Sequence, residues 1–227
     1  MKIALITGAS QGIGASIAKV LNKTKIKVIL VARSKKNLKQ IQKNLTYPKY
    51  SKIISKDLRS LSACKSLNKK VKKINFLMNV AGATKGGHFE KLSDKLWDDG
   101  FNLKFKSALR LSRIFWPTLK RNKGKIINIG GGAGAWEKPL RTFMIGGAVN
   151  AALNHFSKSL ALQGKINKVS VSTINPGMTL TSRLKKLLKA ESKVTKKSTS
   201  QILKERSKAA KITRPTNPEE VANLVYK

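Results

Sequence analysis

Short apolar runs alternate with segments of helical spacing along the whole chain, and this alternation constrains the fold more than any other feature. Parallel strands need crossover connections of roughly a dozen residues, usually a helix, so the order predicts an α/β fold. We expect a doubly wound parallel sheet of the Rossmann type, with residues 1–227 as a single domain. The expected strands, short and rich in β-branched residues, are Ile3–Ile6, Lys27–Val31, Lys52–Ile54, Phe76–Asn79, Lys125–Ile129 and Ser170–Ile174. The expected helices are Ile13–Leu21, Lys36–Leu45, Leu61–Val71, Asp98–Lys120 and Ala148–Leu162.

A glycine-rich turn joins the first expected strand to the first expected helix. Gly8 permits the tight turn, Gly12 lets the backbone approach a pyrophosphate, and Gly14 allows close packing of helix on strand. The helix N-terminus behind the turn offers free N–H groups and the positive end of its dipole. The turn therefore predicts a dinucleotide site whose candidate residues are Thr7, Gly8, Ser10, Gln11, Gly12, Ile13 and Gly14.

The charge of the chain is unusual, with 48 Lys and Arg against 10 Asp and Glu and a formal net charge of +38. Such a field attracts nucleic acids, anionic membranes and phosphorylated small molecules alike. The basic residues are nevertheless spread almost evenly, and most are lysines, whereas a nucleic-acid module concentrates arginine and aromatic residues on one face. We favour a solvated lysine-rich surface and expect no specific nucleic-acid site. A functional attraction to polyanions is the alternative.

Cysteine usage and hydropathy indicate the compartment. The single cysteine, Cys64, has no partner for an internal disulfide, which suits a reducing environment. No apolar stretch approaches the roughly 20 residues that a membrane span needs, and no targeting segment is visible. We therefore expect a cytoplasmic protein without a membrane span. His88 and His155 are far apart and lack metal-ligand spacing, so no metal site is expected.

Six further motifs follow the glycine turn in order, and with it they resemble the short-chain dehydrogenase/reductase family over essentially the whole chain. The matching segments are Asp57-Leu58, Asn79-Val80-Ala81-Gly82, Phe101-Asn102-Leu103-Lys104, Lys125–Ile129, Asn175–Thr181 and Pro218–Ala222. The resemblance implies an NAD(P)-dependent oxidoreductase acting on a small carbonyl or alcohol substrate. It also implies that the cofactor contacts Asp57, Leu58, Asn79, Ala81, Gly82, Pro176, Gly177, Thr179 and Thr181.

The end of the second strand indicates which nicotinamide cofactor binds. A carboxylate there accepts hydrogen bonds from the ribose 2′-hydroxyl of NAD, whereas an arginine accommodates the 2′-phosphate of NADP. The chain reads Val31-Ala32-Arg33-Ser34, without a carboxylate, and Arg33 offers a fork suited to phosphate. We therefore predict that Arg33 and Ser34 line the site and that NADP(H) is preferred over NAD(H).

The catalytic pattern that the resemblance implies is broken. Family reductases use a tyrosine, a lysine four residues later, an orienting serine and a central-helix asparagine. Here the matching positions are Gly146, Asn150 and Gly131, and only the asparagine, Asn102, is retained. No tyrosine occurs between Tyr50 and Tyr226, so no shift of the alignment restores the phenol. Asn150 could still hydrogen-bond a nicotinamide ribose.

Two functional interpretations follow from this loss. The protein is either an oxidoreductase with a non-standard active site or an inactive NADP-binding scaffold or sensor. The retained Asn175–Thr181 loop and a lysine-rich segment at 183–214, expected to be a mobile substrate flap with little apolar face, favour the enzyme. Candidate replacements for the acid are Glu137, Lys138, Arg141 and Thr142, on the loop after the fifth expected strand, and Trp136 on that loop is a candidate ligand contact.

The quaternary structure is expected from the same resemblance. Family members usually pair through two helices that correspond here to Ala108–Leu119 and Ala151–Leu162, both with apolar faces, so we expect a homodimer or tetramer. The chain ends at Lys227 within an expected helix, where the family normally adds one more strand. Without that strand, Ser170–Ile174 would be an unprotected edge.

Overall fold

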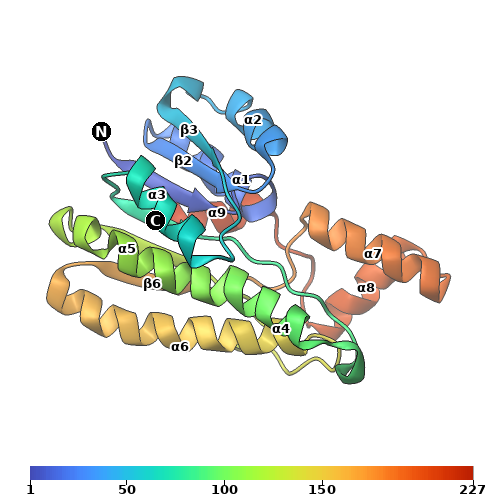
Figure 1. Cartoon of the computed structure of the whole chain (residues 1–227). Coiled ribbons are helices and arrows are strands. Elements are labelled where there is room, and N and C mark those ends of the chain that lie inside the picture. The colour runs from blue at the N-terminus through green and yellow to red at the C-terminus, as the bar shows by residue number, and fades with distance from the viewer. Residues whose placement is uncertain (227) are drawn as a thin grey trace.

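The computed structural model describes residues 1–226, with the backbone alone at 190, 194 and 226. At its centre lies a six-stranded sheet, paired in parallel throughout and ordered β3-β2-β1-β4-β5-β6 (Figure 1). Each expected strand is present to within one residue at either end, and the prediction of an α/β Rossmann-type fold is confirmed. The strands are β1 (Ile3–Thr7), β2 (Lys27–Ala32), β3 (Ser51–Ser55), β4 (Phe76–Asn79), β5 (Lys125–Ile129) and β6 (Ser170–Ile174).

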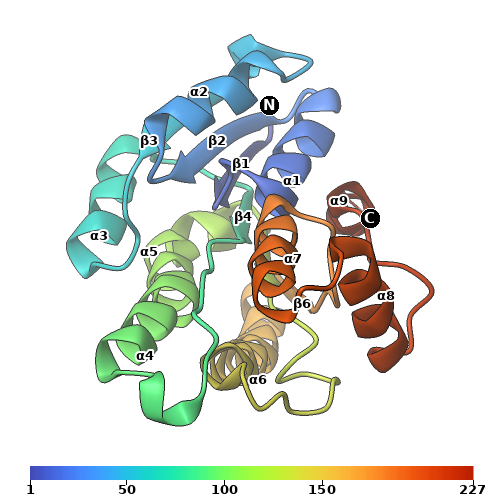
Figure 2. The ribbon, with the colours of Figure 1, turned by 90° about the vertical axis from the view of Figure 1, so that its right-hand side faces the viewer.

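Helices cover both faces of the sheet and make three layers. α1, α2 and α9 pack on one face, while α3, α5 and α6 lie on the other (Figures 1 and 2). Side chains of β1 alternate between the layers: Ala4 and Ile6 join the first core, and Leu5 joins the second. The helices are α1 (Gly12–Lys23), α2 (Lys35–Lys43), α3 (Leu61–Lys70), α4 (Asp94–Gly100), α5 (Ser107–Arg121), α6 (Met144–Asn167), α7 (Ser182–Thr195), α8 (Thr199–Ala209) and α9 (Pro218–Tyr226).

The expected single helix over Asp98–Lys120 is instead a composite. α4 is followed by a π-helical turn, η3 (Phe101–Lys106), and then by α5. A π-helical turn bonds each N–H one residue further back than an α-helix does, which shifts side chains around the axis, and such turns are frequent at functional sites. Apolar spacing cannot reveal it, because a single wide turn barely disturbs the periodicity of the flanking helices. Lys104, described below, lies within this turn.

The segment 183–214 is two packed helices, so the expectation of little apolar face was wrong. α7 and α8 project beyond the carboxyl ends of the strands (Figures 1 and 2). Leu184 and Leu188 on α7 meet Ile202 on α8, and all three are at most 7% exposed. The apolar faces of α7 and α8 are hard to recognise in the sequence, because each helix contributes only a few apolar residues. These residues form a small core once the two helices pack together. The mobility of this segment stays a prediction.

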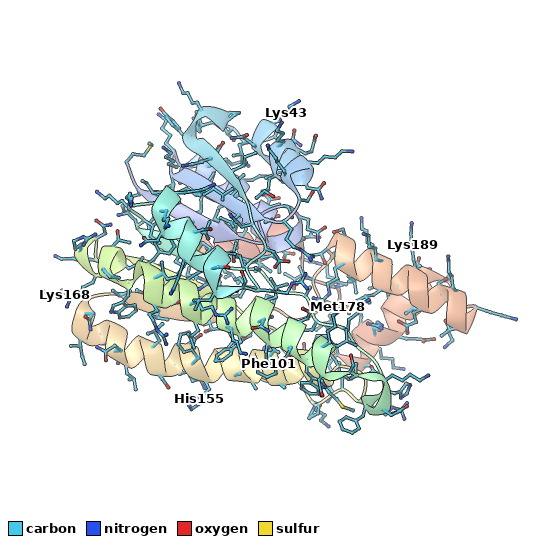
Figure 3. All side chains as sticks on the ribbon, viewed as in Figure 1. Lys43, Phe101, His155, Lys168, Met178 and Lys189 are labelled. Carbon is cyan, nitrogen blue, oxygen red and sulfur yellow. The ribbon has the colours of Figure 1, made fainter. Side chains whose placement is uncertain are left out.

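Surface lysines are distributed around the molecule, as the sequence indicated. Lys43, Lys168 and Lys189 project from three separate edges (Figure 3). Within the described part of the chain, no helix combines the length and apolarity that crossing a bilayer requires. There too, β6 has β5 as its strand partner, so its other edge is unpaired in a single protomer.

Candidate functional site

The glycine turn lies where the strand order reverses, between β1 and β4. Thr7 ends β1, and its hydroxyl accepts hydrogen bonds from the backbone N–H groups of Val80 (2.9 Å) and Ala81 (3.0 Å). This buried threonine therefore ties the glycine turn to the loop after β4. In doubly wound sheets the crevice outside the strand ends at this reversal is the usual ligand site.

The three glycines of the turn are required by the geometry. Gly8 and Gly12 have positive φ angles of 66° and 55°, a region that other residues enter with strain. A Cβ on Gly8 would come within 3.0 Å of the Ala81 backbone. A Cβ on Gly14 would collide with the Gly8 carbonyl oxygen, so the α1 N-terminus sits directly against the turn. The arrangement leaves a cradle for a pyrophosphate.

Arg33 and Asp57 lie side by side just after β2 and β3. Their charged groups are 4.0 Å apart, and the Arg33 side chain is 59% exposed. Asp57 is held more closely by Arg59, which contacts it through its backbone N–H (3.1 Å), Nε (3.2 Å) and Nη2 (3.1 Å). Because Arg59 satisfies the carboxylate, the Arg33 fork remains available to a phosphate. Ser34 caps α2 by accepting from the Asn37 N–H (3.2 Å).

A buried chain of polar side chains supports the end of β4. The Asn79 amide donates to Asn128 Oδ1 (2.8 Å), and the Asn128 amide donates to Ser157 Oγ (2.7 Å). Asn79 Oδ1 is buried and has no hydrogen-bond partner among the described residues. A buried acceptor without a partner is costly. It suits a site whose ligand brings a donor, such as a ribose hydroxyl or an amide.

Asn150 presents a second orphaned oxygen at the neighbouring strand end. Its amide donates to the Ala133 carbonyl (2.8 Å), while Oδ1 is buried without a partner in the described part of the chain. A Cβ on Gly131 would lie 2.7 Å from Asn150 Nδ2, so Asn150 fills the space that a serine at 131 would need. The residues at positions 131 and 150 are therefore matched to each other.

Gly146, like Gly131, lies against a side chain that fills the space where its own Cβ would be. A Cβ at this position would collide with the ring of Phe143, which covers the start of α6. A tyrosine at 146 would have to displace that ring. Restoring the serine and the tyrosine of the ordinary family pattern would thus require Asn150 and Phe143 to move as well.

Lys104 is the site residue that the sequence reasoning missed. Its ammonium donates to the Gly130 carbonyl (2.7 Å), and its side chain lies beside Gly82. Burial, with a smaller contribution from the nearby positive charge of Arg183, lowers the Lys104 pKa to about 7. The sequence did not mark Lys104, because its contacts with Gly130 and Gly82 form only when the loops after β4 and β5 meet this turn.

Asn102, the predicted catalytic asparagine, lies in the π-helical turn η3. Its predicted role stays a prediction. The structure instead brings Lys104, two residues later, to Gly130.

Loops close the site on the remaining sides. Trp136 Nε1 donates to the Asn175 carbonyl (3.2 Å), and its ring lies beside Gly177. Glu137 packs against Gly132 and Gly177, and its partial burial raises the carboxyl pKa. The Pro176 carbonyl accepts from the Gly132 N–H (2.9 Å), which joins the loop after β6 to the one after β5.

The N-terminus of α7 meets the glycine turn. Thr181 caps α7, and its methyl group faces Gly12, while Ser182 Oγ hydrogen-bonds Gln11 Oε1 (3.2 Å). Arg183 donates to the Thr84 carbonyl (2.9 Å) across the opening. Thr179 Oγ1 donates back to the Gly177 carbonyl (3.1 Å).

Other predicted residues differ in their accessibility. Leu58 is 2% exposed and its side chain belongs to the core, so it could face a cofactor only through its backbone. Cys64 is buried, and burial raises the pKa of its thiol, which makes the thiol inert. No group of three or more His, Cys, Asp or Glu side chains that could hold a metal occurs among the described residues.

Comparison with known proteins agrees with this architecture. A model of the short chain dehydrogenase family matches residues 2–192. The chain is 31% identical over 182 residues to an uncharacterized oxidoreductase of Staphylococcus epidermidis, covering 78% of this chain and 77% of the relative. It is 32% identical over 189 residues to the 3-oxoacyl-[acyl-carrier-protein] reductase FabG of Vibrio harveyi, covering 82% and 77%.

Solved structures give the same result. An actinorhodin polyketide ketoreductase with NADPH superposes with a TM-score of 0.90 at 26% identity, covering 99% of this chain and 88% of that chain. L-Sorbose reductase from Gluconobacter frateurii, complexed with NADPH and L-sorbose, superposes with a TM-score of 0.89 at 28% identity and the same coverage. The protein belongs to the short-chain dehydrogenase/reductase family, and these relatives are named as oxidoreductases or reductases.

Proposed function

We propose that this protein is an NADP(H)-dependent oxidoreductase of a small carbonyl or alcohol substrate, with a non-standard active site. The observation that carries the proposal is the glycine cradle at the strand reversal, flanked by an available arginine at the end of β2. The NADPH complexes of the ketoreductase and the sorbose reductase support the choice of cofactor.

Each part of the dinucleotide has a candidate partner. The N-terminus of α1 would receive the pyrophosphate, and Arg33 the 2′-phosphate. The orphaned oxygens of Asn79 and Asn150 would accept hydrogen bonds from donors on the ribose or the nicotinamide amide. The Asn175–Thr181 loop would border the nicotinamide end. When bound, NADPH would supply the hydride, and the chain would bind, orient and protonate the substrate.

We expect the unaltered protein to bind NADPH more tightly than NADH in calorimetric titrations. Arg33→Ser removes a charge-assisted contact and should weaken NADPH binding by about 1–3 kcal/mol while leaving NADH binding nearly unchanged. Lys39→Ser, which removes an exposed cation from the same α2 region, is the matched control and should have little effect. Equal affinities for the two cofactors in the unaltered protein would contradict the assignment.

A catalytically inactive NADP-binding scaffold or sensor is the second candidate function. It is favoured by the residues at 131 and 146, since glycine provides neither the orienting hydroxyl nor the phenol of the ordinary pattern. Turnover of NADPH with a panel of ketones, quinones and acyl-thioester ketones separates the two functions. Cofactor binding without turnover on the whole panel would favour the scaffold.

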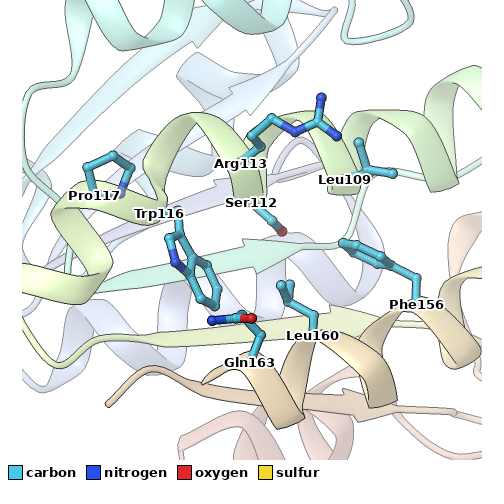
Figure 4. A pocket seen from close by; sticks show the side chains of 8 residues that line it. All are labelled: Leu109, Ser112, Arg113, Trp116, Pro117, Phe156, Leu160 and Gln163. Atoms are coloured by element: carbon cyan, nitrogen blue, oxygen red, sulfur yellow. The ribbon is translucent and has the colours of Figure 1, made fainter. Parts of the chain in front are cut away.

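We also propose self-association through the outer face of α5 and α6. An apolar groove of about 390 Å³ separates these helices, with side chains from both pointing into it (Figure 4). The groove is lined by Leu109, Ser112, Arg113, Trp116, Pro117, Phe156, Leu160 and Gln163.

A charge placed in this groove should separate the subunits. Light scattering is expected to give at least twice the protomer mass of 25.0 kDa for the unaltered protein. Leu109→Glu should shift it toward one protomer, because burying a carboxylate in an apolar interface is costly. Lys120→Glu, on an exposed position of α5, should leave the assembly intact. A monomeric unaltered protein would exclude this interface.

A further inference from the structure

Lys104 lies half-buried between the ends of two central strands. Its Nζ donates to the carbonyl of Gly130, directly after β5. Its Cδ and Cγ lie 2.9 and 3.2 Å from the point where a Cβ on Gly82 would sit, just after β4. Any larger residue at 82 would therefore press on the lysine stem. The π-helical turn η3 carries the side chain to this place.

The ammonium and the orphaned Asn150 oxygen border one glycine-lined segment. Gly130, which accepts from Lys104, is covalently joined to Gly131, which faces the Asn150 amide. This segment occupies the place where the family resemblance expects the residue that orients a substrate carbonyl. The Lys104 ammonium, a proton donor, and Asn150 Oδ1, an acceptor without a partner among the described residues, thus both lie beside the segment that follows β5.

No carboxylate lies within 4.0 Å of the Lys104 ammonium in the described chain. On the preceding helix α4, Asp99 is engaged by Arg59 (2.8 Å). From α7, the facing charge is that of Arg183, another cation. Glu137, on the loop before α6, packs against Gly132 and Gly177 instead. Desolvation and the Arg183 charge both disfavour the protonated amine, which brings the Lys104 pKa to about 7.

We propose that Lys104 is the proton donor of this active site and takes the place of the missing phenol. The inference rests on the proposed oxidoreductase function. In reduction, a hydride from NADPH adds to the carbonyl carbon of the substrate. An N–H bond of the ammonium breaks as the O–H bond of the alcohol forms, so Lys104 is left as a neutral amine and regains its proton from solvent. A group that titrates near the working pH is well matched to this exchange.

Kinetic variants distinguish a proton donor from a structural lysine. Lys104→Met should lower kcat roughly 10²- to 10⁴-fold, the usual worth of a general acid, with the NADPH Kd nearly unchanged. Lys104→Arg keeps the charge and a hydrogen-bond donor but does not titrate near neutrality, so it should stay slow. Lys106→Met, on an exposed position of the same turn, is the control and should resemble the unaltered protein. Recovery of kcat in the arginine variant would show a positioning role and overturn the proposal.

The pH profile adds a second kinetic criterion. The reduction rate of the unaltered protein should fall as pH rises through the Lys104 pKa, because only the ammonium carries the proton. This decrease in rate with rising pH should be absent in Lys104→Arg. The outcome that would contradict the proposal involves Glu137. If Glu137→Gln abolishes the decrease in rate at high pH, while Lys104→Met changes neither that decrease nor the rate itself, the glutamate is the acid and the proposal is wrong.

A measurement on the cofactor-free protein is independent of turnover. The folded protein disfavours the Lys104 proton, so between pH 7 and 10.5 the unfolded chain binds more protons and the protein gains stability as pH rises. Methionine does not titrate. The Tm advantage of Lys104→Met over the unaltered protein should therefore be largest below pH 7 and shrink toward pH 10.5. A Tm difference that does not change with pH would mean that the Lys104 pKa is not lowered in the folded protein. That result would overturn the inference, whatever activity the protein shows. A shrinking difference together with NADPH binding but no turnover would contradict the donor role and the oxidoreductase, while leaving the nucleotide site in place.

Discussion

Gly14→Ala is expected to abolish detectable NADPH binding and to lower the free energy of unfolding by about 1–3 kcal/mol. The added methyl group would collide with the Gly8 carbonyl oxygen, a backbone atom that no rotamer change can move. Relief requires α1 to shift away from β1, which displaces the N–H groups that would receive the pyrophosphate. Calorimetric titration with NADPH, together with denaturant unfolding, measures both effects.

The chain offers a matched control for this change. Gly147, within α6, has no atom other than those of its own stretch of helix within 4 Å of the position where a Cβ would lie. Gly147→Ala should therefore stabilise the protein by about 0.5–1 kcal/mol, the ordinary gain of alanine over glycine in a helix, and leave NADPH binding intact. Unimpaired NADPH binding by Gly14→Ala would show that the turn does not hold the cofactor in the proposed way.

Asn128→Ala is expected to cost about 2–4 kcal/mol of unfolding free energy, because it leaves buried polar groups without partners. Asn128 is fully buried and joins Asn79 to Ser157. Without it the Asn79 amide loses its acceptor, and its Oδ1 is already orphaned. Asn79 should then lose its fixed orientation, so NADPH binding should weaken as well.

Denaturant unfolding and NADPH titration of the same samples separate the two consequences. Asn167→Ala removes a hydrogen bond to the Gln163 carbonyl on the surface of α6 and serves as control, with an expected change within about 0.5 kcal/mol. An unchanged free energy of unfolding in Asn128→Ala would mean that the buried hydrogen bonds of Asn128 contribute little to stability. Lost stability with unaltered NADPH binding would mean that Asn79 does not meet the cofactor.

The sequence predicted the central strands well because they are buried on both faces. β4 and β5 match the expected bounds, since apolar runs between turn residues mark where each strand begins and ends. β6 matches too, although none of its residues is fully buried. The glycine turn was equally predictable, because its function is a backbone conformation that glycine adopts most readily. Thr7, which begins the turn, is joined to the loop after β4 by two hydrogen bonds.

The active-site chemistry was less accessible to sequence reasoning. Matching motifs selected Asn102, whereas the π-helical turn carries Lys104 to Gly130. The pairing of α7 with α8 was missed because neither helix shows its apolar face alone. Gly131 and Gly146 stand at the expected serine and tyrosine positions. The side chains of Asn150 and Phe143 occupy the space beside these two glycines. These contacts form only in the folded chain, so the sequence did not reveal them.

The sequence by itself determined the class of fold, the glycine turn after the first strand, the arginine in place of a carboxylate after the second strand, and the absence of any tyrosine between Tyr50 and Tyr226. These follow from local patterns and residue identities, which are present before the chain folds. Only the tertiary structure decided that Arg59 pairs closely with Asp57, that Asn79 and Asn150 carry buried oxygens without partners among the described residues, and that the half-buried Lys104 reaches the Gly130 carbonyl with a lowered pKa. Burial and hydrogen-bond partners arise when distant segments meet, so no local pattern specifies them.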